Sequence, residues 1–315
     1  MLRILFLYLS KAKWANNLIT HWGFAWRAAS RFVAGEDNEQ ALIIASQLNS
    51  EGFRIALDPL GEHTNTTDAA IAAADEIVGL LDKINQNSVN SYVSIKLSQL
   101  GLLFDETLCY SLLKKILLKA KETGLFIRVD MEDSSITNKT IETTIWMRSI
   151  YQNVGVVIQS YLYRSESDVF TVLKELIPVR MVKGAYNEPK EVAYPNKADV
   201  NENFDKLSQI ILKSNLKFQK LDSSPLHPPI LAIATHDEPR IKNLLDFARI
   251  NGFEKLDFEI QMLYGIRRDL QEKYLDLGYP VRIYIPYGTH WYPYFMRRLA
   301  ERPANVWFFL SNIFK

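Results

Sequence analysis

Two adjacent arginines, Arg297 and Arg298, stand in the segment YFMRRLAERPAN near the C-terminus. Together with Tyr294 and Glu301 they are spaced i, i+3, i+4 and i+7, so a helix places all four on one face. Glu301 can then brace both guanidinium groups, which together form a bidentate clamp for a carboxylate or a phosphate. The alternative is a surface helix with ordinary ion pairs, and the spacing alone does not choose between the two.

A second set of chemically capable side chains lies near the ends of several β-like runs. Side chains alternate between two faces along a strand, and in these runs one of the two faces is polar. An isolated charge inside a barrel is costly unless it is paired or used, so seven polar residues at matching ends predict a functional site. They are Lys96, Asp130, Glu132, Gln159, Arg180, His236 and Gln261.

Several common site motifs are absent from the sequence. It has no G-x-G spacing of glycines, no phosphate-binding GxxxxGK[ST], no HExxH and no G-x-S-x-G. The five histidines stand in separate segments, so we predict no metal site. A net charge of +1 gives no overall field for nucleic acid, which we exclude as a partner.

The elements that must position these residues alternate along the chain as strand and helix. Eight β-like runs are separated by segments such as 107–124, whose apolar residues recur every three or four positions and which ends at Gly124. This order predicts an α/β fold, a (β/α)8 TIM-like barrel, with the arginine-pair helix over the barrel mouth. The runs are 53–58, 92–98, 126–132, 154–161, 179–186, 230–237, 256–263 and 281–288.

We predict two parts: an N-terminal helical arm at 1–50 and the barrel at 51–315, with a lid or extra helix in the long gap at 187–229. Residues 1–35 are basic and rich in tryptophan, which fits either packing on the barrel or contact with a membrane surface. No run is long enough to span a membrane. A lone Cys109 suits a cytoplasmic protein, with peripheral contact at the inner membrane as the second reading. The residues at steps of four in the arm are Trp14, Leu18, Trp22 and Trp26.

Four segments are similar to the motifs of the proline dehydrogenase family: VRMVKGAY, ATHDEP, FEIQMLYG and VRIYIPYGTHWYPYFMRRLAERPANVWFFL. The resemblance runs from about residue 50 to 311. It implies a barrel that binds FAD non-covalently and oxidises L-proline to Δ1-pyrroline-5-carboxylate by hydride transfer from C5 to flavin N5. It also implies a quinone acceptor, a role as the first step of proline degradation to glutamate, and a separate pyrroline-5-carboxylate dehydrogenase downstream. With nothing after residue 315 to supply an aldehyde dehydrogenase domain, the monofunctional bacterial type is expected.

The resemblance also assigns roles to individual residues. Asp130 and Arg180 match catalytic positions, with Arg180 near flavin N5. The substrate-binding set has Lys96, Arg297 and Arg298 on the proline carboxylate, Tyr284 on the ring, and Tyr294 and Glu301 shaping the arginine helix. The matched FAD contacts are Met131, Gln159, Arg180, Val182, Lys183, Gly184, Thr235, His236, Gln261 and Phe308.

One departure and two alternatives remain open. Asp237 stands where the family motif leads us to expect asparagine, which puts that local contact in doubt. A Schiff-base aldolase on the same barrel, with Lys96 or Lys183 as nucleophile, is the first alternative. The second is a non-catalytic protein that has kept the fold, because this barrel hosts many functions.

Overall fold

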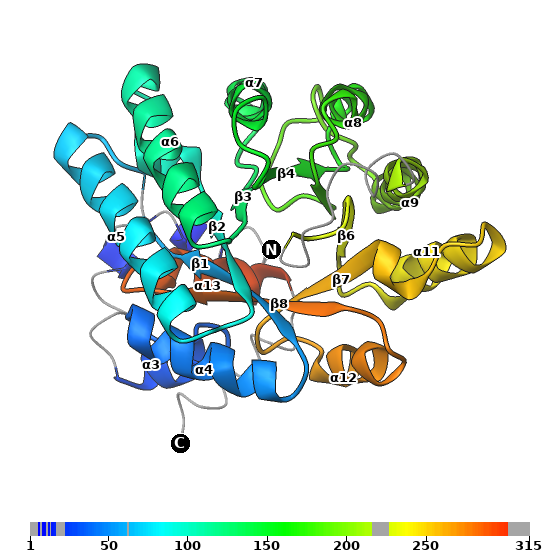
Figure 1. Cartoon of the computed structure of the whole chain (residues 1–315), viewed down its shortest axis with the longest axis horizontal. Helices are drawn as coiled ribbons and strands as arrows, with labels where there is room; N and C mark the ends of the chain where they lie inside the picture. The colour runs from blue at the N-terminus through cyan, green and yellow to red at the C-terminus, as the bar shows by residue number, and fades with distance from the viewer. Residues whose placement is uncertain are drawn as a thin grey trace.

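Eight parallel strands close into a barrel in chain order, with β8 pairing with β1 (Figure 1), which confirms the predicted (β/α)8 fold. The computed structural model describes residues 6, 8–10, 12, 14–16, 23–61, 63–215 and 227–301, and only the backbone at 23, 24 and 301. The strands are β1 (Arg54–Pro59), β2 (Ser91–Ile95), β3 (Ile127–Val129), β4 (Val154–Gln159), β5 (Val179–Val182), β6 (Leu231–Ala234), β7 (Phe258–Leu263) and β8 (Val281–Tyr287).

Side chains alternate between the barrel interior and the surrounding helices, as strand geometry requires. The outward residues of every strand, such as Ile55 and Val93, belong to the main hydrophobic core between the strands and the helices. The inward residues are largely polar or aromatic. Several strands end earlier than predicted, β2 at Ile95 and β3 at Val129, so Lys96 and Asp130 begin the loops of the barrel mouth.

Seven helices follow the strands and cover the outside of the barrel (Figure 1). The side chain of Thr66 caps the first of them and that of Asp105 caps the second, each accepting a backbone N–H bond from the first turn. The second helix ends at Glu122, just before Gly124 at φ +70°, close to the predicted stop. The helices are α5 (Thr67–Gln86), α6 (Glu106–Glu122), α7 (Thr137–Arg148), α8 (Ser165–Lys174), α9 (Lys197–Lys213), α11 (Glu238–Ile250) and α12 (Arg268–Asp276), and η1 (Leu97–Leu100) and η2 (Lys255–Asp257) are short 3-10 turns.

The long gap at 187–229 contains α9, which packs on β5, β6, α8 and α11 as an ordinary member of the helical ring. The predicted extra helix above the barrel is therefore wrong for the described part of this gap. The periodicity of 197–213 identified a helix, but periodicity does not say which neighbours a helix packs against. The loop before α9 carries Tyr186 and Glu188 to the mouth.

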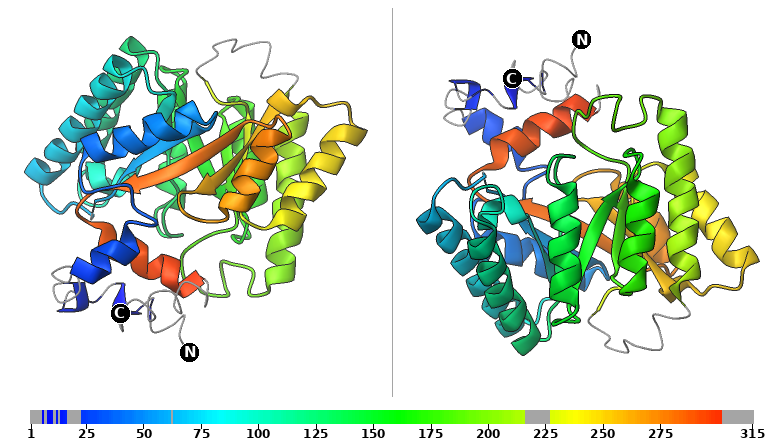
Figure 2. Two further views of the ribbon diagram at one scale, coloured as in Figure 1. Left: turned by 90° about the horizontal axis from the view of Figure 1, so that it is seen from below. Right: turned by 90° about the horizontal axis from the view of Figure 1, so that it is seen from above.

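Two helices, α4 (Asn38–Ser50) and α13 (Trp291–Glu301), depart from simple strand–helix alternation. The helix α4 packs on β1 and β8 and occupies a place in the ring, between α12 and α5 in Figure 1. The helix α13, which follows β8, instead packs on α3 (Gly23–Ala29) at one end of the barrel (Figure 2). A second apolar cluster joins α3 and α13 to Leu60, Leu263 and Ile266, which follow or end β1 and β7 at their carboxyl ends. The boundary at residue 50 stays a prediction, although α4 itself packs on the barrel.

The arm's tryptophans behave differently from one another. Trp26 packs against Trp291 of α13 with ring centroids 5.5 Å apart, whereas Trp14 is 60% exposed. Leu18 and Trp22 lie outside the described residues. In the described part of the chain, no helix combines the length and the apolar character needed to cross a membrane.

Candidate active site

A lysine held by two carboxylates lies at the mouth of the barrel. Lys96, directly after β2, donates to Asp58 of β1 over 2.6 Å and to Asp130, directly after β3, over 3.4 Å. Parallel strands bring their carboxyl ends to the same rim, which is why these three residues meet. Burial alone lowers the pKa of Lys96, but the charges of Asp58 and Asp130 outweigh it and the pKa is raised. Lys96 is therefore a fixed positive charge.

Asp130 also binds two groups from other strands of the barrel, one on β5 and one on β8. The guanidinium of Arg180 donates to it over 2.7 Å, and the hydroxyl of Tyr284 donates over 2.6 Å. The guanidinium of Arg180 also lies 5.0 Å from the centre of the Tyr284 ring. Burial and the charge of Asp130 raise the pKa of Tyr284 well above its ordinary value, so this hydroxyl stays protonated and keeps its donor role.

Arg180 is buried and fully engaged by the protein. Besides Asp130, it donates to the Gln261 side chain over 2.6 Å, to the Tyr92 hydroxyl over 3.1 Å and to Ser94 over 2.8 Å. Burial lowers the pKa of Arg180, but the interactions with Tyr92 and Asp130 raise it by a larger amount. The pKa of Arg180 therefore lies above its ordinary value. The site thus contains two permanent cations, Lys96 and Arg180, joined by one aspartate.

The arginine pair lies on α13 above this network. Arg298 is 8% exposed, and its guanidinium lies 5.0 Å from the ring centre of Tyr294, which is four residues earlier as the predicted face requires. Arg297 is half-buried. Burial and Glu132 raise the pKa of Tyr186 to about 12, while the charges of Lys96 and Arg297 oppose this rise. Lys96 and Arg297 therefore act on the same phenol at the mouth.

Two assigned residues fall outside what can be located. Glu301 ends α13, but its side chain lies outside the described residues, so its predicted role as a brace remains a prediction. Phe308, the predicted contact to the adenosine part of FAD, also lies outside them.

The remaining predicted cofactor residues gather at the carboxyl ends of β3 to β7. Lys183 donates to Asn201 of α9 and to Asp237, each over 2.5 Å. Asp237, the departure from the family motif, is thus the ion-pair partner of Lys183. The other residues at these ends are Met131, Gln159, Val182, Gly184, Thr235 and His236.

Several of these residues make bonds that hold the mouth loops in place. The Gln159 side chain donates to the Glu132 carbonyl over 2.8 Å, and the backbone N–H of Leu263 donates to His236 over 2.9 Å. Gly184 is exposed at φ +125°, and a Cβ there would lie 2.4 Å from the Tyr161 ring, so only glycine fits. Glu132 itself accepts from the backbone N–H of Ser98 over 3.1 Å, which places its carboxylate beside the loop after β2.

Three residues of this network were missed by the sequence-based argument. Asp58 ends the first β-like run, on the same face as Arg54 and Ala56, so the alternation that identified Lys96 also marks it. Tyr92 lies on the same face as Lys96 but reads as an ordinary aromatic strand residue. Tyr186 comes from the loop after β5, and no periodicity marks a loop residue.

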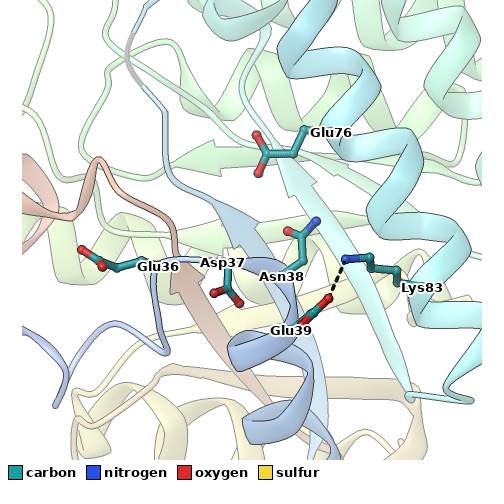
Figure 3. Close-up of a pocket in the computed structure, with 6 residues that line it drawn as sticks. All are labelled: Glu36, Asp37, Asn38, Glu39, Glu76 and Lys83. Carbon is teal, nitrogen blue, oxygen red and sulfur yellow. Dashed lines mark ion pairs between the residues drawn. The ribbon is translucent and has the colours of Figure 1, made fainter.

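A polar pocket lies away from this network, between the start of α4 and α5 (Figure 3). Within it, Glu39 pairs with Lys83 over 3.6 Å between exposed side chains. Exposed acidic groups of this kind are an ordinary solvated surface. Among the described residues, no three histidine, cysteine, aspartate or glutamate side chains group as a metal site. The lining residues are Glu36, Asp37, Asn38, Glu39, Glu76 and Lys83.

Comparisons with known proteins agree on one family. The sequence pattern described as "Proline dehydrogenase" matches residues 41–310. "Proline dehydrogenase 2" of Bacillus subtilis (strain 168) is 38% identical over 314 residues, which cover 99% of each chain. "Proline dehydrogenase" of Deinococcus radiodurans is 42% identical over 296 residues, covering 92% of this chain and 91% of that relative.

Among solved structures, proline utilization A from Bdellovibrio bacteriovorus, inactivated by N-propargylglycine, matches with a TM-score of 0.80 at 24% identity. The match covers 91% of this chain but 33% of that one, so this chain spans about a third of its length. At this identity the likeness shows the fold alone, a barrel with the same arrangement of elements. The family match over most of the sequence and the two relatives of nearly equal length establish that this chain belongs to the proline dehydrogenase family.

Proposed function

We propose that this chain is an FAD-dependent proline dehydrogenase that oxidises L-proline to Δ1-pyrroline-5-carboxylate. The observation that carries the proposal is the pair of fixed cations at the mouth. Asp130 binds both Lys96 and Arg180, and it also accepts a hydrogen bond from the Tyr284 hydroxyl. Above these residues lies a helix that carries two further arginines. The carboxylate of a small saturated amino-acid ring is the group that a protein can bind most strongly. Clustered cations bind a carboxylate through charge-assisted hydrogen bonds.

In this proposal, Lys96, Arg297 and Arg298 bind the proline carboxylate. The Tyr284 ring, held by its hydroxyl bond to Asp130, forms one wall for the proline ring. The chain's main contribution is then orientation, because a bound substrate with its C5 directed at the cofactor reacts as if at a very high local concentration. Binding on α13 also excludes water from the mouth.

The residues at the carboxyl ends of β4 to β7 fit an FAD group. Gln159, Thr235, His236 and Gln261 supply amide, hydroxyl and imidazole groups, the ordinary partners of a flavin's ring nitrogens and oxygens. Lys183 supplies a cation for the phosphates, and the exposed backbone at Gly184 allows close approach. Asp237 opposes an anion here, and its bond to Lys183 offsets that charge.

The reaction removes two electrons and two protons from proline. A hydride leaves C5, the ring nitrogen loses a proton, and a C5–N double bond forms. When bound, FAD would supply the electron acceptor, with its N5 facing proline C5. Arg180 stays positively charged and would stabilise negative charge that develops next to its guanidinium during the reaction.

A quinone is the proposed final electron acceptor, and residues 1–35 are the proposed contact with the membrane that contains it. The exposed Trp14 and Tyr8 support this placement, because tryptophan and tyrosine favour the membrane–water boundary. In this proposal, the oxidation of proline is the first step of proline degradation to glutamate. The product would then pass to a separate pyrroline-5-carboxylate dehydrogenase.

The decisive experiment is anaerobic addition of L-proline to the purified protein. We expect a flavin absorption spectrum that bleaches with L-proline and is unchanged with D-proline at the same concentration. A protein that purifies without flavin and binds none added would contradict the proposed cofactor. A flavin that stays oxidised with saturating L-proline would contradict the proposed substrate.

The aldolase alternative is disfavoured by the state of Lys96. A Schiff-base lysine must lose its proton, and the enzymes that use one lower its pKa. Here the pKa of Lys96 is raised by Asp58 and Asp130, and Lys183 is tied to Asp237. Borohydride with candidate carbonyl substrates should therefore leave both lysines unmodified, which mass spectrometry of peptides would establish.

A further inference from the structure

The hydroxyl of Tyr92 lies inside the barrel, directly below the network at the mouth. Tyr92 is 1% exposed, and its oxygen receives one hydrogen bond from Arg180 over 3.1 Å and one from the Gln261 side chain over 2.8 Å. Guanidinium and amide nitrogens donate and do not accept. Among the described residues, no acceptor takes the hydroxyl hydrogen of Tyr92.

The orientation of the Gln261 amide is fixed from the other side. Its nitrogen also donates to Glu259, and its oxygen accepts from Nε of Arg180 over 2.6 Å. Glu259 is in turn held by Arg282 over 2.9 and 3.1 Å. Reversing the amide would direct two donors at each other and two acceptors at each other, so the nitrogen must face Tyr92.

Charged groups surround Tyr92 from each strand that packs against it. The guanidinium of Arg282 on β8 lies 4.1 Å from its ring centre, that of Arg128 on β3 lies 5.8 Å away, and that of Arg180 on β5 lies 5.9 Å away. Glu259 on β7 is a carboxylate that opposes them, Asp130 binds the same Arg180 guanidinium over 2.7 Å, and Ser94 follows on β2 itself. The remaining neighbours are apolar or aromatic, with Phe126 at 5.6 Å and Ala56 and Tyr284 in the same cluster. The three guanidinium groups around the ring favour a negative charge on the phenol.

The expected titration agrees with this geometry. Burial raises the pKa of Tyr92, but Arg180, Arg128 and Arg282 outweigh it, and the pKa is lowered. Seven other tyrosines among the described residues have a raised pKa, with burial as the largest cause. The phenol of Tyr92 is therefore set apart from these seven.

We propose that Tyr92 is a positioning residue that holds Arg180 and Gln261 as a hydrogen-bond acceptor. The three guanidinium groups around its ring should let this phenol ionise at a lower pH than an ordinary tyrosine. The phenolate would bind the Arg180 guanidinium more strongly than the phenol does. The role in catalysis rests on the proposed function, whereas the ionisation does not. Tyr92 touches no proposed substrate group and acts through Arg180.

The first test is an ultraviolet titration of phenolate absorption in the purified protein. Wild type minus Tyr92→Phe should show one phenol that ionises below about pH 10, the ordinary value for tyrosine. The matched control is Tyr274→Phe, because Tyr274 is equally buried at 1% and, in the described part of the chain, its hydroxyl has no hydrogen-bond partner. Wild type minus Tyr274→Phe should show no such early step. A Tyr92 difference spectrum without ionisation below that pH would overturn the proposed titration.

The second test separates turnover from substrate binding. Tyr92→Phe should lower kcat about tenfold, the effect of losing one hydrogen bond to a charged group, with little change in the proline KM. Tyr274→Phe should leave both constants as they are. An unchanged kcat, or a KM that rises in step, would overturn the positioning role. If proline does not reduce the wild-type protein, the proposed function is rejected. The phenolate titration does not depend on that function and would still test the ionisation of Tyr92.

Discussion

At the scale of single residues, Asp130 is the point where the site is joined. It accepts from Lys96, Arg180 and Tyr284, which come from loops or strands far apart in the sequence. A carboxylate has two oxygens and can accept all three bonds at once. Removing the charge of Asp130 leaves the Lys96 and Arg180 cations near each other with less negative charge to balance them. We therefore expect both substrate binding and turnover to change.

We expect Asp130→Asn to lower the free energy of unfolding by about 3 kcal/mol, because one partner of a buried ion pair is lost while the other stays buried. It should also lower kcat and raise the proline KM together. Urea unfolding and steady-state kinetics measure these effects. Asp75→Asn is the control, because Asp75 pairs with Lys115 over 2.5 Å on the exposed surface, where such a pair contributes little. Equal effects of the two variants would contradict the role given to Asp130.

The charge of Lys96 gives a prediction about pH. Its folded pKa is raised above the ordinary 10.5, so its contribution to stability is fully present below pH 10.5 and is lost only as pH rises through the still higher folded value. Binding of an unreactive five-membered-ring carboxylate should therefore not weaken through loss of the Lys96 charge up to about pH 10. Calorimetric titration across this range, with Lys96→Met as the comparison, measures it. Binding that falls between neutral pH and pH 10 in wild type but not in Lys96→Met would show that Lys96 titrates in that range.

At the scale of elements, the unusual feature is that α4, not the helix after β8, lies between α12 and α5 in the ring. The helix α13 instead covers the mouth and is held there by apolar contacts with α3 and with the turn that follows it. Trp26 meets Trp291 at 5.5 Å, and Phe32 meets Phe295 at 6.3 Å. The arginine pair is thus positioned by the N-terminal part of the chain.

We expect Trp291→Ala to raise the proline KM strongly while the barrel stays folded. Trp291 is 2% exposed, and removing a buried tryptophan of this kind costs about 3–5 kcal/mol, here in the cluster that holds α13 rather than in the main core. Kinetics together with far-ultraviolet circular dichroism measure the two properties. Trp146→Ala on α7, where the side chain is 47% exposed, is the control. A KM that stays at the wild-type value would show that these contacts do not position the arginines.

The sequence predicted the strands well because alternation between two faces is strict, and each of the eight β-like runs overlaps a strand. Lys96, Asp130, Arg180 and Gln261 were selected by that alternation before any resemblance was considered. The place of α4 was not predictable in this way, since a helical pattern identifies a buried face but not its partner. Asp58 could have been found by the same alternation, whereas Tyr186 could not, because its position depends on the path of a loop.

At the scale of the whole molecule, a polar network fills the barrel from its mouth to its opposite end. It runs from Lys96 through Asp130, Arg180 and Gln261 to Glu259, which binds Arg282 and lies 3.7 Å from Arg54. Such a network stabilises a single arrangement of its side chains when every member is hydrogen-bonded. A substitution at one residue therefore also affects the residues bonded to it. The interior therefore connects the proposed site to the far end of the barrel.

The exposed aromatic residues of the arm predict how the molecule meets a membrane. Tyr8 and Trp14 are 62% and 60% exposed. The double substitution Tyr8→Ser and Trp14→Ser should weaken binding to anionic lipid vesicles in a sedimentation assay and leave soluble-acceptor activity unchanged. Point changes are preferable to deleting residues 1–35, because α3 supports α13. Trp146→Ser is the control for general loss of an exposed tryptophan, and equal vesicle binding by all three proteins would reject the membrane role of the arm.

The pairing of β8 with β1 has a consequence for how the protein is made. Six residue pairs, from Arg54 with Arg282 to Pro59 with Tyr287, join a strand near the start of the chain to one near its end. During synthesis on the ribosome, β1 must wait for more than two hundred residues before its partner emerges, and α13 emerges later still. A nascent chain that stops short of β8 therefore has no closed barrel, and the proposed cofactor and substrate sites can form only after α13 has emerged.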